Sequence, residues 1–197
     1  MVAAGFRAST DEDVISAAEV AVICVPTPLS LEGSPDLGPI TAAGQAVGRQ
    51  LRPGMTVILQ STTYPGTTEE VLIPLLEEGS GLTAGQDFHV AFSPERIDPG
   101  NARFGMRNTP KVVGGLTPAC TEAARAFYAR FVDEVVLAKG PKEAEMAKLL
   151  ENTYRHINIA LVNEMARFAH ELDIDFWNVI DMAKTKPFGF QAFYPGT

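Results

Sequence analysis

Short apolar runs that alternate with helical stretches limit the possible folds of this chain more than any other feature. The runs lack the polar–apolar alternation of a strand with one wet face, and they lie at residues 20–25, 56–59, 89–92, 111–113 and 134–137. Helical patterns lie near residues 10–18, 40–51, 65–76 and 118–131. Strands that are buried on both faces and joined by helices form a mainly parallel sheet. We therefore predict an α/β fold with a partial doubly wound, Rossmann-like parallel sheet.

The pattern changes after Pro141. Residues 142–172 contain neither proline nor glycine, and their apolar residues recur near helical spacing. A helix of about 30 residues would be roughly 45 Å long, which is too long for a crossover within a small sheet. We expect this long helix to open an all-α central domain, with a shorter helix near 176–183 behind it. The predicted domains are residues 1–139 and 140–197.

Charge and composition argue against two classes of partner. The formal net charge of −8 repels a phosphate backbone, so we expect no binding to nucleic acid. No run approaches the about 20 apolar residues that span a bilayer, and the N-terminus shows no export signal. We expect a cytoplasmic protein that makes no contact with a membrane.

The cysteines and histidines show neither a metal-binding pattern nor a disulfide framework. Cys24 and Cys120 are far apart and lack CxxC spacing, and the three histidines form no ligand pattern, so we predict no metal site. Cys24 lies within the apolar run 21–25. That setting favours an inert thiol buried in the core over a reactive thiol.

Polar segments follow three of the predicted strands, at the edge where doubly wound sheets bind ligands. They are VPTP at 25–28, QSTTYPGTT at 60–68 and SPERIDPGN at 93–101. The second places several hydroxyls and a helix N-terminus at that edge, where free N–H groups favour an anionic group. In the third, Glu95 is placed to act as a general base. Each segment also has a simpler interpretation, as a turn, a helix cap or a charged surface loop.

The predicted long helix carries one further candidate pair. Lys148 and Asn152 are four residues apart, so they share one face of the helix, and Glu145 precedes Lys148 by three residues. An ammonium beside an amide can hold an oxyanion or a substrate hydroxyl. A lysine that extends from an apolar face into water is the alternative interpretation.

Six segments, taken together and in this order, resemble the UDP-glucose and GDP-mannose dehydrogenase family. They are VICVPTPL, STTYPGTTEE, FSPERIDPGN, KVVGG, EMAKLLENTYRHINIALVNEMA and FYPG. The loop SPERIDPGN is similar to the branch that oxidises UDP-N-acetylglucosamine or its mannosamine epimer. The resemblance extends from about residue 18 to residue 197, which is nearly the whole chain.

The resemblance implies a reaction and a role for each matching residue. Family members oxidise the C6 alcohol of the sugar to a carboxylate by two hydride transfers to NAD, through a cysteine thioester that water hydrolyses. Residues 1–139 would then be the C-terminal part of an NAD-binding domain, and a homodimer through the long helix would be expected. The implied NAD contacts are Val25, Pro26, Thr27, Ser61 and Thr62. The implied catalytic residues are Thr62, Glu95, Lys148 and Asn152. The implied UDP-sugar contacts are Glu95, Arg96, Lys148, Asn152, Phe193, Tyr194, Pro195 and Gly196.

Two family motifs are absent from the sequence. They are the GxGxxG turn that holds the NAD pyrophosphate, with the acidic residue after it, and the GGxC segment that carries the catalytic cysteine. Neither Cys24 nor Cys120 lies in such a context, so neither is predicted to be the nucleophile. We expect this polypeptide alone to be inactive.

Three alternatives stay open. The sugar nucleotide could instead be UDP-glucose or GDP-mannose. A short, non-catalytic protein that binds a nucleotide and dimerises through the long helix is an alternative of another class. A β-hydroxyacid dehydrogenase also has a Rossmann domain, a long helix and a Lys–Asn pair, although STTYPGTTEE and SPERIDPGN speak against it.

Overall fold

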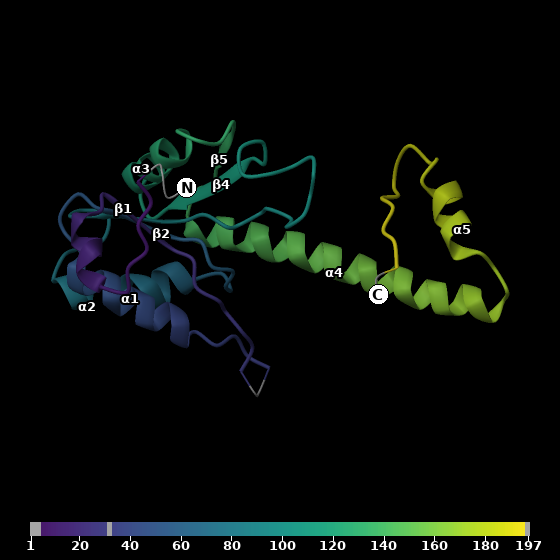
Figure 1. The fold of residues 1–197 in the computed structure, drawn as a ribbon, viewed down its shortest axis with the longest axis horizontal. Helices are drawn as coiled ribbons and strands as arrows, with labels where there is room; N and C mark the ends of the chain where they lie inside the picture. Colours follow the sequence, from purple (N-terminus) through teal and green to yellow (C-terminus); the bar gives the residue numbers. More distant parts are fainter. Residues whose placement is uncertain (1–4, 31–32, 196–197) are drawn as a thin grey trace. The chain divides into compact units, whose positions relative to one another are not determined.

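A computed structural model describes residues 5–30 and 33–195, and its first part contains a five-stranded sheet (Figure 1). The strands follow one another across the sheet in the order of the sequence. Neighbours pair in parallel, except that β4 runs antiparallel to β3. The strand bounds are β1 Val20–Ile23, β2 Thr56–Leu59, β3 His89–Phe92, β4 Lys111–Gly115 and β5 Val135–Leu137. The predicted α/β fold with a mainly parallel sheet is confirmed.

Both faces of this sheet are covered, which explains why its central strands are apolar throughout. Val57 and Leu59 of β2 belong to a core cluster shared with α1 (Gly38–Gln50) and α2 (Ile73–Ser80). Ile58, between them, belongs to a second cluster on the opposite face, shared with α3 (Pro118–Tyr128). Successive strand side chains point to opposite faces, so helices on both sides require an apolar residue at every position.

The connecting segments differ in detail from the sequence prediction. The predicted first helix is a 3₁₀ helix, η2 (Glu12–Ala17), capped by the side chain of Asp11. The helix expected at 65–76 begins as a π-helix, η3 (Thr68–Leu72), and continues as α2. Helix α3 ends at Tyr128, three residues before the predicted end. Runs of apolar residues predict that these elements exist, but their ends depend on caps and packing.

Two consecutive glycines in β4 allow other segments to approach the sheet closely. A Cβ atom on Gly114 would clash with the backbone of Gly140, and one on Gly115 would clash with the backbone of Thr121. The first contact lies at the approach to the long helix and the second lies in the first turn of α3. The segment KVVGG therefore fixes where two helices begin relative to the sheet.

The long helix is α4 (Pro141–Glu171), and α5 (Phe176–Ala183) follows it. The chain divides into two compact units, Met1–Leu149 and Leu150–Thr197, so α4 begins in the first and continues in the second. The predicted domain boundary at residues 139 and 140 stays a prediction. In the first unit, Ala144 of α4 is fully buried in the core.

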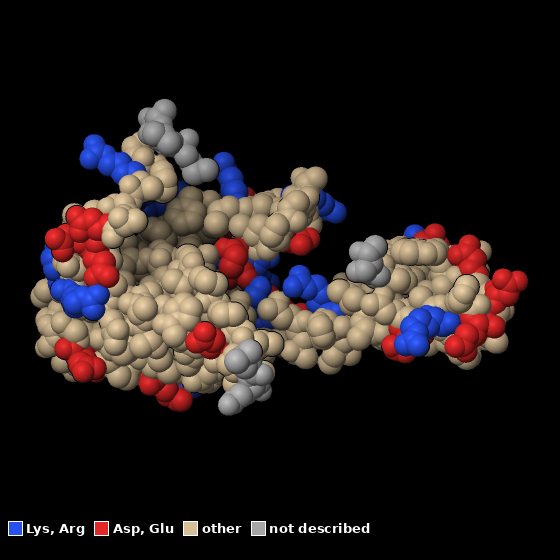
Figure 2. Space-filling model, turned by 60° about the horizontal axis from the view of Figure 1, so that its bottom comes forward, with Lys and Arg blue, Asp and Glu red and all other residues tan. Residues whose placement is uncertain are grey.

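Of the helices in the described residues, none combines the length and apolarity needed to cross a membrane. Figure 2 shows acidic and basic side chains interspersed on the face that it presents.

Candidate active site

The carboxyl ends of β1, β2 and β3 meet at one edge of the sheet. A pocket of about 220 Å³ lies there, and its lining residues are Cys24, Val25, Gln60, Ser61, Thr62 and Glu95. The parallel register explains this, because Ile23 of β1 pairs with Leu59 of β2, which pairs with Phe92 of β3. The three polar segments predicted to lie at the ligand edge therefore do so.

The Ser61 hydroxyl links the segments 25–28 and 60–68 by hydrogen bonds. Its hydroxyl accepts a hydrogen bond from the Val25 N–H (2.8 Å) and donates one to the Val25 carbonyl (2.7 Å). The Thr27 hydroxyl donates to the Thr62 carbonyl (2.8 Å). Ser61 is buried and Thr62 is exposed. Ser61 thus shapes the loop of Val25, Pro26 and Thr27, whereas Thr62 is exposed at the pocket.

The other hydroxyls of this segment are also used inside the protein. Thr63 and Thr67 both donate to the Tyr64 carbonyl, and Thr68 donates to a carboxylate of Glu145. Helix capping and loop closure, the simpler interpretation of this segment, account for most of these hydroxyls. Among the serine and threonine side chains of the segment, Thr62 is the exposed one.

Glu145 corrects the expectation of an anion site at the helix N-terminus. Its carboxylate accepts hydrogen bonds from the N–H groups of Gly66 (2.6 Å) and Thr68 (2.9 Å) and from the Thr68 hydroxyl (2.7 Å). The Glu145 side chain is fully buried. The helix N-terminus does attract an anion, as expected from its free N–H groups, but that anion is supplied by α4. Sequence reasoning missed this role because the partners lie nearly eighty positions apart.

The carboxylate of Glu95 is held by four donors. The N–H groups of Arg96 (2.8 Å) and Ile97 (2.7 Å) donate to Oε1. Gln60 Nε2 (2.8 Å) and Lys111 Nζ (3.2 Å) donate to Oε2. Partial burial alone would raise the pKa of Glu95, but the Ile97 N–H and the Lys111 charge outweigh it and hold that pKa below its usual range. Glu95 therefore faces the pocket as a carboxylate.

Lys111 is a site residue that sequence reasoning missed. It begins β4, and because β4 is antiparallel to β3, this first residue lies at the same edge as the carboxyl ends of β1, β2 and β3. Lys111 is only 3% exposed, and its ammonium lies 5.2 Å from the ring centroid of Tyr128. Burial lowers the pKa of Lys111, and Glu95 only partly offsets that effect. The sequence predicts Lys111 only as the first residue of the strand 111–113 and indicates no role for it.

Three further residues are predicted to belong to the site: Lys148, Asn152 and Arg96. Lys148 of α4 is close enough for its charge to contribute to the lowered pKa of Lys111. Asn152 follows Lys148 by one turn of the same helix, and both are half-buried. Arg96 donates from Nη1 to the carbonyl of Pro110 (2.7 Å), which anchors the segment after Glu95. The catalytic and binding roles of all three stay predictions.

The expectation of a core thiol at Cys24 is wrong. Strand β1 ends at Ile23, and Cys24 is exposed at the pocket. Desolvation still raises the pKa of the Cys24 thiol, an effect that Lys111 opposes and Glu95 reinforces. A thiol with a raised pKa has less thiolate at neutral pH, which fits a thiol that is not a nucleophile. Cys120 is buried, as a core residue of α3.

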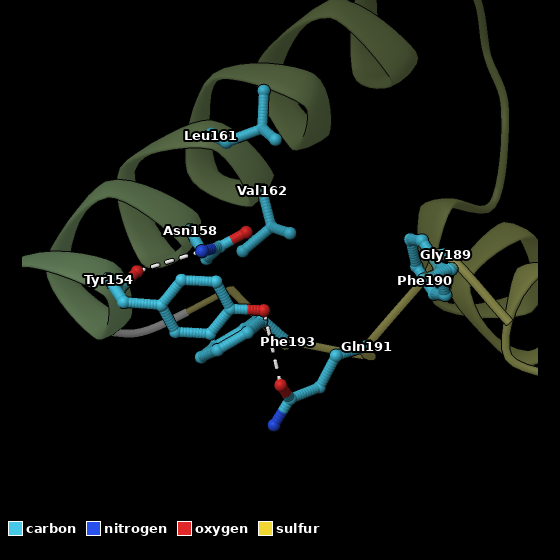
Figure 3. A pocket seen from close by; sticks show the side chains of 8 residues that line it. All are labelled: Tyr154, Asn158, Leu161, Val162, Gly189, Phe190, Gln191 and Phe193. Carbon is cyan, nitrogen blue, oxygen red and sulfur yellow. Dashed lines mark hydrogen bonds between the residues drawn. The ribbon is translucent and has the colours of Figure 1, made fainter. Parts of the chain in front are cut away.

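The predicted sugar-binding loop lies in the second unit. Phe193 packs edge-to-face on Tyr154 of α4 (5.8 Å between centroids), and the Tyr154 hydroxyl donates to Gln191 Oε1 (3.1 Å). These side chains line a cavity of about 600 Å³ (Figure 3). Tyr194 stacks on Trp177 of α5 (5.7 Å). Pro195 is half-buried, and Gly196 lies outside the described residues. The role of this loop in binding a sugar stays a prediction.

Comparison with known proteins identifies relatives of both units. Residues 1–132 match the NAD binding domain of the UDP-glucose/GDP-mannose dehydrogenase family, and residues 142–197 match the central domain of that family. The chain is 42% identical over 189 residues to Protein CapL of Staphylococcus aureus, covering 95% of this chain and 44% of CapL. It is 40% identical over 178 residues to UDP-N-acetyl-D-glucosamine 6-dehydrogenase of Pseudomonas aeruginosa, covering 90% of this chain and 42% of that enzyme.

A solved structure is also similar to this chain. The UDP-D-ManNAc dehydrogenase of Pyrococcus horikoshii superimposes with a TM-score of 0.89 at 36% identity, covering 95% of this chain and 44% of that protein. The chain thus spans less than half the length of each of these three relatives.

Proposed function

Because this chain belongs to the UDP-glucose/GDP-mannose dehydrogenase family, we propose that it forms part of an NAD-dependent enzyme that oxidises the C6 alcohol of a UDP-N-acetylhexosamine to a carboxylate. The printed names of the P. aeruginosa and P. horikoshii relatives support this substrate class. The observation that carries the proposal is Glu95, an ionised carboxylate that faces a pocket at the ends of β1 and β2. UDP-glucose and GDP-mannose are the alternative substrates.

The residues around the pocket fit the nicotinamide end of NAD. The pocket wall combines the apolar Val25 with the exposed Thr62, and Ser61 fixes the loop of Val25, Pro26 and Thr27. These five residues would hold the cofactor, and two NAD molecules bound in turn would each accept one hydride, one at each oxidation. Because the Ser61 hydroxyl is already bonded to Val25, we assign Ser61 to shaping this wall. The pyrophosphate would need the GxGxxG turn, which the sequence lacks.

The remaining steps need a base and a cation. In the proposed reaction the first oxidation removes a hydride from C6 and a proton from its hydroxyl, which gives an aldehyde. The thiol of the cysteine in the GGxC motif adds to this aldehyde, and the second oxidation removes the remaining hydride from C6 and the new hydroxyl proton, which gives a thioester. Water then hydrolyses the thioester to the carboxylate and the free thiol. Glu95 would take a proton from that water, with Thr62 holding the water in place. Lys148 and Asn152 would stabilise the negative oxygen on C6. Loss of one such contact typically raises a barrier by about 3–4 kcal/mol. Arg96 and residues 193–196 would contact the UDP-sugar.

An assay of NADH formation tests the substrate proposal. The 197-residue chain and a version extended with its flanking coding sequence would each be mixed with NAD and UDP-N-acetylglucosamine, UDP-N-acetylmannosamine, UDP-glucose or GDP-mannose. We expect the extended protein to show its highest kcat/KM with an N-acetylated sugar, and the 197-residue chain to show no turnover because it lacks the GxGxxG and GGxC motifs. Preference of the extended protein for UDP-glucose or GDP-mannose would refute the substrate assignment, and turnover by the short chain would refute its inactivity.

We further propose a cytoplasmic enzyme of polysaccharide biosynthesis that dimerises through α4. Five apolar side chains of α4 are more than half exposed in the described structure: Met146 (53%), Leu150 (67%), Ile157 (60%), Leu161 (56%) and Phe168 (55%). Exposed apolar surface of this kind marks an interaction site. Light scattering of the extended protein should give a dimer mass and a monomer mass for Ile157→Glu. A monomeric wild-type protein would contradict this proposal.

A further inference from the structure

The two side chains of the ion pair between Lys111 and Glu95 differ in their exposure to solvent. The Lys111 side chain is 4% exposed, whereas that of Glu95 is 36% exposed and reaches the pocket. A buried ammonium loses hydration, so it depends on the partners that surround it. Here those partners are a carboxylate oxygen and the ring face of Tyr128. The sheet therefore holds a buried cation against Oε2 of a carboxylate that also reaches the pocket.

A polar network beside this pair limits how Glu95 can turn. Gln60 donates from Nε2 to Glu95 Oε2 (2.8 Å), and the Tyr128 hydroxyl donates to Gln60 Oε1 (2.9 Å). The bond from Tyr128 fixes which end of the Gln60 amide is the donor. Gln60 comes from the end of β2, Lys111 from the start of β4 and Tyr128 from α3. Two elements, β2 and β4, thus supply donors to one carboxylate oxygen, and α3 orients one of those donors.

We infer that Lys111 is a positioning residue that holds the Glu95 carboxylate in place and directed into the pocket, where the carboxylate can act as the base. This inference rests on the role of Glu95 in the proposed function and assigns the group that controls it. Lys111 itself does not touch the reacting atoms. It acts by fixing Oε2, while the backbone N–H groups of Arg96 and Ile97 fix Oε1.

The charged and titratable groups around the pair come from every element packed against it. They are Cys24 after β1, Arg96 after β3, Tyr128 of α3 and Lys148 of α4. The Lys111 ammonium itself donates a hydrogen bond to the Glu95 carboxylate. Removing the Lys111 charge should therefore raise the pKa of Glu95, so that Glu95 becomes protonated at a higher pH.

Carbon NMR of the 197-residue chain tests this without requiring turnover. The Cδ resonance of Glu95, assigned by its loss in Glu95→Gln, is followed against pH in wild type and in Lys111→Met. We expect the midpoint to rise by about one pH unit in Lys111→Met. Lys111→Arg, which keeps the charge, should restore most of the wild-type midpoint. Lys184→Met removes a cation paired with the exposed Asp181 and should leave Glu95 unchanged.

The wild-type titration provides a second test, which does not require Lys111→Met to fold. The Lys111 Cε resonance should shift at the same pH as Glu95 Cδ, since protonation of the carboxylate removes the partner of the ammonium. An unchanged Glu95 midpoint in folded Lys111→Met, or no linked step at Lys111 in wild type, would overturn the inference. In the extended protein, Lys111→Met should move the acid limb of kcat upward by the same amount. Failure of the extended protein to oxidise any UDP-sugar would instead count against the proposed function.

Discussion

At the level of single residues, Tyr128, Gln60, Glu95 and Lys111 form a continuous network that reaches from α3 to the pocket. The sequence pointed to Glu95 because a charged residue follows a strand end in a doubly wound sheet. It did not point to Lys111, because the pairing of β4 with β3 is antiparallel and cannot be read from either strand alone. Cys24 was misplaced for a related reason, since an apolar run does not show where the strand ends.

Tyr128 gives a residue-level prediction about alkaline pH. Burial raises the pKa of Tyr128 from 10.0 to about 12. The unfolded chain therefore loses this proton first, so the stability that depends on the neutral phenol is complete below pH 10 and is lost as pH rises toward 12. Over that range the free energy of unfolding should fall by roughly 2 to 3 kcal/mol because of this group.

Urea unfolding of wild type and Tyr128→Phe across this pH range measures the effect. The variant should be less stable at neutral pH, through loss of the bond to Gln60, and should lose less stability on the alkaline side. Tyr64→Phe, at an exposed tyrosine, should keep the wild-type pH dependence. Parallel curves for wild type and Tyr128→Phe would show that Tyr128 does not contribute.

At the level of elements, α4 is tied to the rest of the first unit by its first two turns. Glu145 caps η3, and Lys142 forms ion pairs with Glu69 (3.4 Å) and Glu70 (3.0 Å) of that helix. Apolar spacing was sufficient to predict the long helix, and the absence of proline and glycine set its length. The same spacing could not show that Glu145 points inward, because a glutamate at one helix position is usually solvated.

Replacing Glu145 should test this connection. Glu145→Ala leaves the buried N–H groups of Gly66 and Thr68 without their carboxylate, so we expect a loss of about 3 kcal/mol in the free energy of unfolding. Glu164→Ala, on the same helix, removes an exposed carboxylate paired with Arg167 (3.4 Å) and should cost less than about 1 kcal/mol. Equal losses for the two variants, measured by urea unfolding, would mean that the capping contact contributes little.

The glycines of β4 provide a second element-level prediction. Gly114→Ala places a methyl group against the Gly140 backbone, which cannot move without shifting the start of α4. We expect a loss of roughly 2 to 3 kcal/mol, as for overpacked cores. Gly105→Ala is a matched control, because nothing lies within 4 Å of its added Cβ. A thermal melt in which Gly114→Ala matches wild type would contradict the close approach seen here.

At the level of the whole molecule, the first unit has the sheet, both helical layers and the pocket, and the second carries most of α4 and the loop of Phe193 and Tyr194. The strands, the mainly parallel sheet covered by helices and the polar edge followed from hydrophobic pattern and from general rules for parallel sheets. The partners that fix each functional side chain did not, because they depend on contacts between distant positions, such as Ser61 with Val25 and Gln60 with Tyr128. The family segments supplied the remaining link from the pocket to a reaction.

Pre-steady-state NADH formation in the extended protein tests the central claim that Glu95 serves hydrolysis while Lys148 serves oxidation in one site. With the preferred UDP-sugar, Glu95→Gln should release two NADH per active site and then stop, with the thioester detectable by mass spectrometry. Lys148→Ala should slow the first NADH itself, by about 100-fold or more. Lys184 directly follows α5 and forms an exposed ion pair with Asp181, so Lys184→Ala should behave as wild type. Steady turnover at the wild-type rate in both Glu95→Gln and Lys148→Ala would contradict the account.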